Sequence, residues 1–123
     1  MKAINSLKAP KAIGAYSQAI EENGMIYVSG QLPLNAQNGE LVGEIKAATA
    51  QALNNLKYIL EEANSSMANV VKTTIYLANM SDFADVNAVY SEFFSEPFPA
   101  RACFQVAKLP KDALLEIECI AKK

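Results

Sequence analysis

The 123-residue sequence contains no histidine and no tryptophan. The absence of histidine removes the side chain that most often acts as a general base at neutral pH and as a zinc ligand. It also excludes serine–histidine and cysteine–histidine nucleophile pairs. Any catalysis must therefore use carboxylates, lysine, tyrosine, cysteine, arginine, backbone groups or water.

Cysteine is scarce too, because Cys103 and Cys119 are the only two. Two thiols cannot complete a structural zinc site by themselves. Both lie in apolar, strand-like segments, where the simplest interpretation is a reduced thiol in the core. The sequence also lacks an apolar run of roughly 20 residues, the length of a membrane span, and an N-terminal signal peptide. We expect a cytoplasmic protein with no membrane partner.

Neither sign of charge dominates, since eleven basic and thirteen acidic residues give a net charge of −2. The lysines are spread along the chain without the basic cluster that is typical of nucleic-acid-binding proteins. Glycine-rich nucleotide-binding loops are absent, as is the HExxH zinc motif. We therefore expect no cofactor, no metal centre and no nucleic-acid partner.

The hydrophobic periodicity predicts a series of strands and two helices. The pair Asn23-Gly24 favours a type I′ turn and predicts a hairpin. Apolar residues recur at helical spacing in two segments and alternate in several others. The predicted helices are Glu44–Ala63 and Ser81–Phe94, the latter with Ser81 as N-cap, and the predicted strands are Gln18–Glu22, Met25–Gly30, Asn69–Leu77, Arg101–Ala107 and Leu114–Ala121.

This order of elements predicts a two-layer α+β architecture in a single domain, residues 1–123. Two helices that are each apolar on one side can cover only one face of a sheet. The third predicted strand is expected to direct Val71 and Thr73 towards the helices. Its opposite face still carries Val70 and Tyr76, and covering such residues requires another molecule, which motivates the hypothesis of an oligomer.

Arg101 is the only arginine, and it follows Pro99-Ala100 at the beginning of a predicted strand. Its planar fork can bind a carboxylate through two parallel hydrogen bonds, which lysine cannot do. A surface or inter-strand ion pair is the alternative interpretation. Cys103 shares the face of the strand on which Arg101 lies.

Glu116 and Glu118 alternate along the last predicted strand and share one face with Leu114 and Ile120. A solvent-exposed polar face is the simpler interpretation. A partly dehydrated glutamate has instead a raised pKa and can transfer protons near neutral pH. The sequence does not fix the register that would bring Glu116 to Arg101.

Three further polar residues are candidates for a binding site. Asn87 falls within the apolar stripe of the second predicted helix, where its amide is either a boundary residue or lines a pocket. Tyr16 lies in a glycine-containing turn, and Ser29 lies near the end of a predicted strand. Tyr16 and Ser29 each offer a hydroxyl group, and the alternative is a purely local role in the turn or loop.

Several blocks form a pattern that covers nearly the whole chain. The most specific is FPARACFQVAKLPKDALLEIE at 98–118, where Pro-Ala-Arg precedes an alternating strand, a Leu-Pro-Lys turn and a Glu-Ile-Glu strand. Supporting blocks are IGAYSQA at 13–19, VSGQLP at 28–33, VKTT at 71–74 and DFADVN at 82–87. Together they resemble the reactive-intermediate deaminase family, also called RidA, YjgF or L-PSP endoribonuclease-like proteins.

The resemblance implies a chorismate-mutase-like fold, with two helices packed on one face of a mixed sheet of about six strands. It also implies a homotrimer with sites in the clefts between subunits. The implied enzyme is a hydrolase, a 2-iminobutanoate/2-iminopropanoate deaminase, which converts enamines and imines such as 2-aminoacrylate to 2-keto acids and ammonia. These intermediates leak from pyridoxal-phosphate-dependent dehydratases, so a functional link to such enzymes is implied as well.

The resemblance also suggests roles for the candidate residues. By similarity, Arg101 holds the carboxylate of the 2-imino or 2-keto acid, and Glu116 acts on the attacking water with backbone groups near Cys103. Tyr16, Ser29 and Asn87 line the site. Tyr16 can also return a proton. Imines hydrolyse spontaneously, so orienting the substrate and transferring one proton is a sufficient task for an enzyme without histidine.

Two other functions stay open at this point. The first is a regulatory protein that binds 2-keto or amino acids in the same cleft without turnover. The second is the endoribonuclease or translation-inhibitor activity attached to the family name, against which the acidic composition and the absence of histidine argue.

Overall fold

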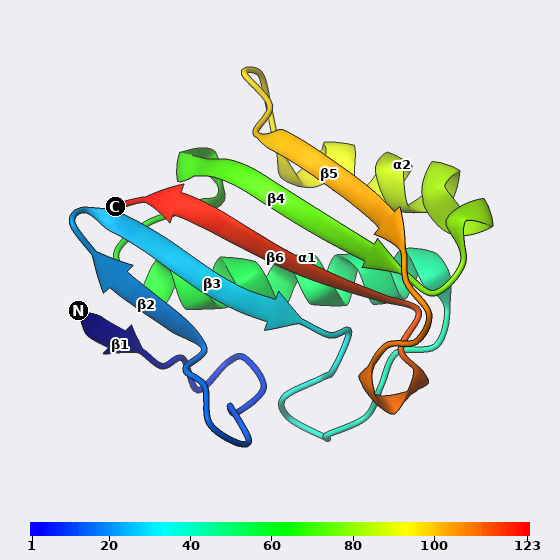
Figure 1. Ribbon diagram of the computed structural model, residues 1–123, viewed down its shortest axis with the longest axis horizontal. Helices are drawn as coiled ribbons and strands as arrows, with labels where there is room; N and C mark the ends of the chain where they lie inside the picture. The colour runs from blue at the N-terminus through cyan, green and yellow to red at the C-terminus, as the bar shows by residue number, and fades with distance from the viewer.

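A six-stranded sheet and two helices packed behind it form the two layers of the molecule (Figure 1). The computed structural model describes residues 1–123. The strand order is β1-β2-β3-β6-β4-β5, and every neighbouring pair is antiparallel except β4 and β5. The strands are β1 (Lys2–Ile4), β2 (Ala19–Glu22), β3 (Met25–Gln31), β4 (Val70–Leu77), β5 (Ala100–Gln105) and β6 (Leu115–Lys122).

Both helices lie on the same face of the sheet (Figure 1), which confirms the predicted α+β layering and the mixed sheet. Neither helix is long and apolar enough to cross a membrane. Strand β1 was not predicted, because its three residues carry too little pattern and depend on pairing with β2. The helices are α1 (Ile45–Glu62) and α2 (Phe83–Phe93), and the short 3₁₀ turns are η1 (Met67–Asn69), η2 (Met80–Asp82) and η3 (Pro110–Asp112).

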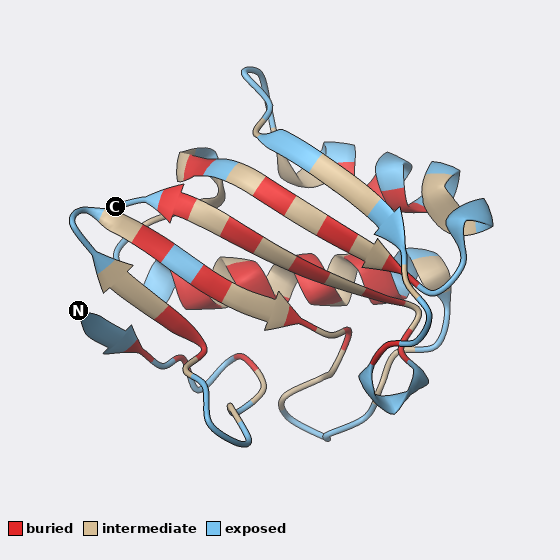
Figure 2. Ribbon diagram, in the orientation of Figure 1, coloured by how far each residue is buried: buried red, intermediate tan, exposed pale blue.

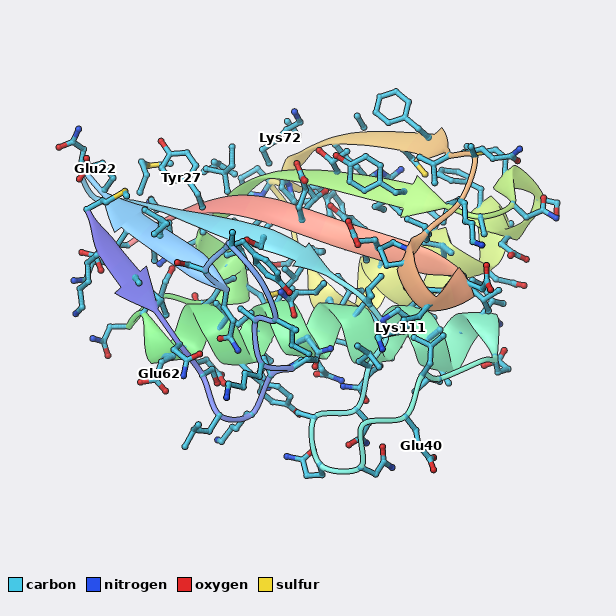
Figure 3. All side chains as sticks on the ribbon, turned by 60° about the horizontal axis from the view of Figure 1, so that its bottom comes forward. Glu22, Tyr27, Glu40, Glu62, Lys72 and Lys111 are labelled. Atoms are coloured by element: carbon cyan, nitrogen blue, oxygen red, sulfur yellow. The ribbon has the colours of Figure 1, made fainter.

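The hydrophobic core fills the space between the layers with one cluster of 22 buried residues. Helix α1 contributes Leu53, Leu56 and Ile59 from its apolar stripe, all fully buried. Buried and less buried residues alternate along β3, β4 and β6 (Figure 2), as expected for strands with one covered face. Tyr27 and Lys72 project from the other, open face, away from the helices (Figure 3).

The ends of α1 follow the local signals in the sequence. The carboxylate of Glu44 accepts hydrogen bonds from the backbone N–H groups of Lys46 at 3.2 Å and Ala47 at 2.7 Å. These bonds lower the pKa of Glu44 and satisfy donors that have no partner within the helix. Asn64 adopts a left-handed conformation with φ of 59° and stops the helix, as its side-chain type favours.

Two local predictions were wrong. Val71 does not face the helices: it is 43% exposed, whereas Val70 is 7% exposed and belongs to the core. The pairing of β4 with β6 shifts register between Val70 and Lys72, and this irregularity reverses the alternation at the beginning of the strand. Ser81 is not the N-cap either, because α2 begins at Phe83 with Asp82 as its N-cap. Ser81 lies inside η2, and its N–H donates a 3.0 Å hydrogen bond to the side chain of Asn79, which caps η2.

The two cysteines are free, with Cys119 buried and Cys103 half-buried. Burial raises the pKa of the Cys119 thiol to about 12, so this thiol stays protonated at neutral pH. Cys119 belongs to the core cluster and Cys103 packs against it. The prediction of free core thiols is confirmed for Cys119, whereas Cys103 is free but only half-buried and packs against the core from outside the cluster.

Candidate functional site

Arg101 lies near the beginning of β5, at the edge of the sheet, and its guanidinium group reaches towards α2. Its Nη1 donates a 2.7 Å hydrogen bond to Oδ1 of Asn87. Its Cζ lies 4.9 Å from the centre of the Tyr90 ring and 5.4 Å from that of Phe83, within the range of cation–π attraction. A neutral amide and two aromatic rings therefore surround the only arginine in the sequence.

No carboxylate neutralises Arg101. The three ion pairs of the molecule involve other groups, and Asn87 is its single hydrogen-bonding partner among the side chains. The ion-pair interpretation is therefore wrong for this chain. Since a guanidinium group has five N–H donors, most of the fork stays available to an anion. A cavity of about 400 Å³ opens beside it, lined by Asn87, Tyr90, Ser91, Phe98, Pro99 and Arg101.

Cys103 lies two residues after Arg101 and on the same face of β5, as predicted. In the parallel pairing, Arg101 is opposite Thr73 and Cys103 is opposite Ile75, and both partners are buried on the helix side. Burial raises the pKa of the Cys103 thiol, and the charge of Arg101 opposes this only in part. A protonated thiol is a weak nucleophile, so Cys103 suits a packing role beside the arginine.

Glu116 lies on the opposite, open face of the sheet, where β6 pairs its position with Tyr76 of β4. It lines a second cavity, of about 690 Å³, together with Tyr16, Ser29, Glu118 and neighbouring residues of the N-terminal loop and η3. Ser29 donates a 2.6 Å hydrogen bond from its Oγ to the carbonyl of Ser17 and holds the two segments together. Tyr16 is 54% exposed at the mouth of this cavity.

The surroundings of Glu116 make its carboxyl group harder to ionise than that of an ordinary glutamate. Burial raises its pKa, and the negative charge of Glu118 raises it further. No side-chain cation pairs with it. A carboxyl group with a raised pKa can accept and return a proton closer to neutral pH than an ordinary glutamate.

Gly30 shapes the position of Glu116 and was missed as a site residue. Pairing between β3 and β6 is irregular between Val28 and Gln31, which places Gly30 at this interruption. A Cβ atom at position 30 would lie 2.7 Å from Cδ of Glu116, too close for a real contact. The signal in the sequence was a glycine within a strand pattern, which marks a close approach.

The six predicted site residues thus fall into two groups. Asn87, Arg101 and Cys103 lie on the helix side of β5, whereas Tyr16, Ser29 and Glu116 lie in the second cavity, which reaches the open face. We call these the arginine half-site and the glutamate half-site. Within one chain the sheet separates them, so the two charged groups do not meet.

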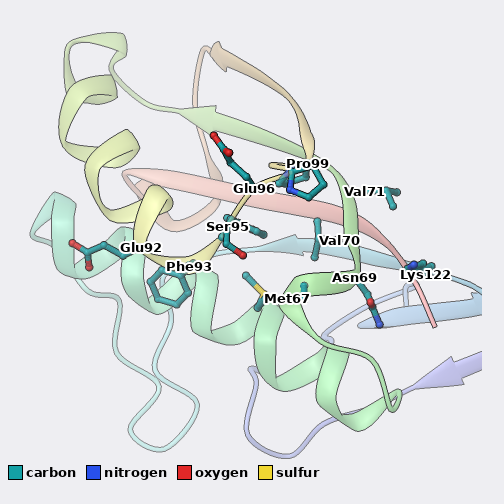
Figure 4. Close-up of a pocket in the computed structure, with 13 residues that line it drawn as sticks. Met67, Asn69, Val70, Val71, Glu92, Phe93, Ser95, Glu96, Pro99 and Lys122 are labelled. Atoms are coloured by element: carbon teal, nitrogen blue, oxygen red, sulfur yellow. The ribbon is translucent and has the colours of Figure 1, made fainter.

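A third cavity, of about 500 Å³, lies between the end of α2 and the beginning of β4 (Figure 4). Its charged side chains are Glu92, Glu96 and Lys122, and it contains none of the predicted site residues. No group of three or more cysteine, aspartate or glutamate side chains is arranged to hold a metal ion anywhere in the chain. The two half-sites remain the strongest candidates for a binding function.

Comparison with known proteins gives consistent matches over nearly the whole chain. The family model described as Endoribonuclease L-PSP matches residues 6–123. The chain is 51% identical over 123 residues to the proposed regulator AldR of Lactococcus lactis, covering 99% of this chain and 98% of the relative. It is 46% identical over 123 residues to the 2-iminobutanoate/2-iminopropanoate deaminase of Escherichia coli, covering 98% of this chain and 96% of the relative.

The fold of the chain also matches solved structures. The crystal structure of Escherichia coli TdcF with bound serine superimposes with a TM-score of 0.96 at 38% identity, covering 100% of this chain and 99% of that chain. Sequence, fold and the family model therefore agree with the resemblance found in the motifs. The chain belongs to the RidA/YjgF family of L-PSP endoribonuclease-like proteins.

Proposed function

We propose that this protein is an enamine/imine deaminase that hydrolyses small 2-imino acids to 2-keto acids and ammonia. The observation that carries the proposal is Arg101, a cation that is held by Asn87 and aromatic rings and has no carboxylate partner. Such a group is ready to bind the carboxylate of a small acid. The 46% identity to a deaminase named for 2-iminobutanoate and 2-iminopropanoate supports this substrate class.

We further propose that the active site forms between subunits of a homotrimer. One chain separates its arginine half-site from its glutamate half-site, and the open face of the sheet has no covering layer. In a ring of subunits, the arginine half-site of one copy meets the glutamate half-site of the next. This arrangement brings Arg101 to Glu116 without any rearrangement inside the chain.

The proposed reaction has three steps. Arg101 binds the substrate carboxylate and fixes the position of the neighbouring C=N carbon. A water molecule adds to the carbon of the protonated imine while Glu116 accepts one of its protons, giving a neutral carbinolamine. Glu116, directly or through Tyr16, then returns this proton to the nitrogen of the carbinolamine. As the C–N bond breaks and ammonia leaves, the hydroxyl proton passes to the Glu116 carboxylate, which gives the 2-keto acid, and Glu116 finally releases that proton to ammonia or water.

The catalytic demand of this reaction is small. Imines hydrolyse in water without an enzyme, and a positioned acid or base contributes about 10²–10⁴-fold. The raised pKa of Glu116 favours proton exchange near neutral pH, and the substrate is oriented by Arg101. No cofactor is required, and Ser29, Asn87 and Cys103 shape the cleft.

The substrates are short-lived, so they must be made close by. We place the reaction in the cytoplasm, downstream of pyridoxal-phosphate-dependent dehydratases that release enamines from amino acids. The serine bound to TdcF shows that a relative accommodates a small amino acid. A nucleic-acid substrate is not part of the proposal, since the chain carries a net charge of −2 and no histidine.

A coupled assay tests the proposal directly. A dehydratase generates 2-aminoacrylate or 2-iminobutyrate, and release of the 2-keto acid is followed with wild-type protein, Arg101→Ala and the control Lys46→Ala. Lys46 also carries a positive charge, but it lies exposed on α1 and lines neither half-site. We expect acceleration by the wild type and by Lys46→Ala, and none by Arg101→Ala; acceleration by all three proteins would refute the assignment of Arg101.

A ligand-binding regulator is the second candidate, favoured by the relative named as a proposed regulator at 51% identity. It would use the same unpaired Arg101 to bind a 2-keto or amino acid. Calorimetric titration with 2-ketobutyrate separates the two functions. Binding that is lost in Arg101→Ala, without imine hydrolysis by the wild type, supports the regulator.

A further inference from the structure

We propose that Tyr90 is a positioning residue that presents the Arg101 guanidinium to the substrate, an inference that rests on the proposed deaminase function. Tyr90 takes no part in the reaction steps described above. Its ring lies 4.9 Å from Cζ of Arg101, and its hydroxyl group is 2.7 Å from Oγ1 of Thr73. These two contacts connect the arginine to the interior of the sheet.

The Tyr90 side chain is itself held in place by burial and by two contacts. Tyr90 is 4% exposed, and its ring centre lies 4.5 Å from that of Phe94 at an interplanar angle of 36°. The hydroxyl bond to Thr73 ends on a fully buried residue of β4. Burial raises the pKa of Tyr90, so the hydroxyl group stays neutral and keeps this bond through the physiological pH range.

These contacts form a closed loop around the arginine. Thr73 is the residue of β4 that pairs in register with Arg101 of β5. The backbone therefore joins Arg101 to Thr73, a hydrogen bond joins Thr73 to Tyr90, and the Tyr90 ring returns to the Arg101 guanidinium. An exposed arginine side chain is ordinarily free to adopt many rotamers, and this loop restricts it.

The restriction matters because bidentate binding depends on the plane of the guanidinium group. Asn87 accepts one N–H bond, while the rings of Tyr90 and Phe83 occupy positions beside the group. The remaining donors are available to the cavity lined by Arg101, Tyr90 and Asn87. Pre-orienting the fork reduces the entropy that substrate binding must remove.

The single arginine makes this inference measurable without an activity assay. Because the chain has only one arginine, its side-chain Nε–Hε group gives one NMR signal, which reports the nearby aromatic rings and the mobility of the group. We compare the wild type with Tyr90→Phe, which keeps the ring, and Tyr90→Leu, which removes it. The control is Tyr58→Leu, a half-buried tyrosine of α1 that packs on the core away from Arg101.

For Tyr90→Leu we expect a shifted and more mobile arginine signal, and a KM for the imine that rises roughly tenfold with little change in kcat, because ground state and transition state lose the same contact. Tyr90→Phe loses the bond to Thr73 but keeps the buried ring packed on Phe94 beside the guanidinium, so its KM should rise by no more than about threefold, less than that of Tyr90→Leu. Tyr58→Leu should lower the melting temperature and leave both the signal and KM unchanged.

Two results would overturn the inference. One is a Tyr90→Leu protein with an unchanged arginine signal and KM and only a lower melting temperature. The other is a Tyr90→Phe protein as impaired as Tyr90→Leu. If Tyr90→Leu does not fold, Phe83→Leu removes the ring at 5.4 Å and the same signal is followed. A wild type that neither binds 2-ketobutyrate nor hydrolyses the imine refutes the proposed function, while the NMR comparison still decides the role of Tyr90.

Discussion

Gly30 lies directly against the carboxyl group of Glu116, so the position of the proposed proton-transfer group depends on the absence of a side chain at residue 30. An added Cβ would come within 2.7 Å of Cδ of Glu116 and closer still to Oε1. The carboxyl group is the end of a flexible side chain and would move away. Gly30 of β3 therefore leaves the space that the Glu116 carboxyl group occupies in the glutamate half-site.

The first prediction concerns Gly30→Ala. The backbone at Gly30 does not have a positive φ, so alanine fits the conformation and the fold should survive. The displaced Glu116 should lower kcat by about 10²-fold, because general base catalysis requires correct geometry. Gly43→Ala is the matched control, since nothing lies within 4 Å of an added Cβ there. Full activity of Gly30→Ala would show that the placement of Glu116 is unimportant.

The second prediction concerns Glu116→Gln, which keeps the shape of the side chain and removes its proton transfer. We expect kcat to fall by about 10²–10⁴-fold. KM should change little, because Arg101 binds the carboxylate independently. Steady-state kinetics in the coupled assay measure both parameters. An undiminished kcat would exclude Glu116 as the group that activates water.

The third prediction concerns the pH dependence of the reaction. Burial and the charge of Glu118 raise the pKa of Glu116. Only the ionised form of Glu116 accepts a proton from water. The rate should therefore fall as the pH drops through this raised pKa. Removing the charge in Glu118→Gln lowers the pKa of Glu116 and should move the acidic limb of the pH–rate profile to lower pH. A shift to higher pH contradicts the proposed electrostatics.

The fourth prediction concerns Cys103→Ser. Burial raises the pKa of the Cys103 thiol, which favours its protonated, weakly nucleophilic form at neutral pH. The variant should keep kcat within about threefold of the wild type, since only packing next to Arg101 changes. A loss comparable to that of Arg101→Ala would mean that the thiol takes part in the reaction.

The fifth prediction concerns stability. Leu56 is fully buried between α1 and the sheet, so Leu56→Ala should lower the free energy of unfolding by about 2–5 kcal/mol. Leu7 is 89% exposed, and Leu7→Ala should change it by less than about 0.5 kcal/mol. Denaturant unfolding of both variants measures the difference, and similar values for the two would contradict the position of the core.

The layers of the fold could be predicted from the sequence because long, periodic segments carry their own signal. The stripe of α1 and the alternation of β6 correspond closely to their burial. The phase of β4 could not be predicted, since the register shift between Val70 and Lys72 arises from pairing with β6, a strand far away in the sequence. Strand β1 likewise depends on its partner β2.

The members of the site were easier to predict than their arrangement. Arg101 stands out as the only arginine, and the motif containing it also contains Glu116. Nothing local shows that these residues lie on opposite faces, because that depends on how β5 and β6 each pair with β4. The contact between Tyr90 and Arg101 likewise requires packing of α2 against β5.

The central claim, an active site shared between subunits, is tested most directly by mixing two inactive proteins. Arg101→Ala and Glu116→Gln subunits are unfolded together, refolded in equal amounts and assayed for imine hydrolysis. In a cyclic trimer, each mixed assembly contains one cleft with both native residues, so random mixing should restore about one quarter of wild-type activity. A mixture that stays as inactive as its two components, although mixed trimers are present, would contradict the shared site.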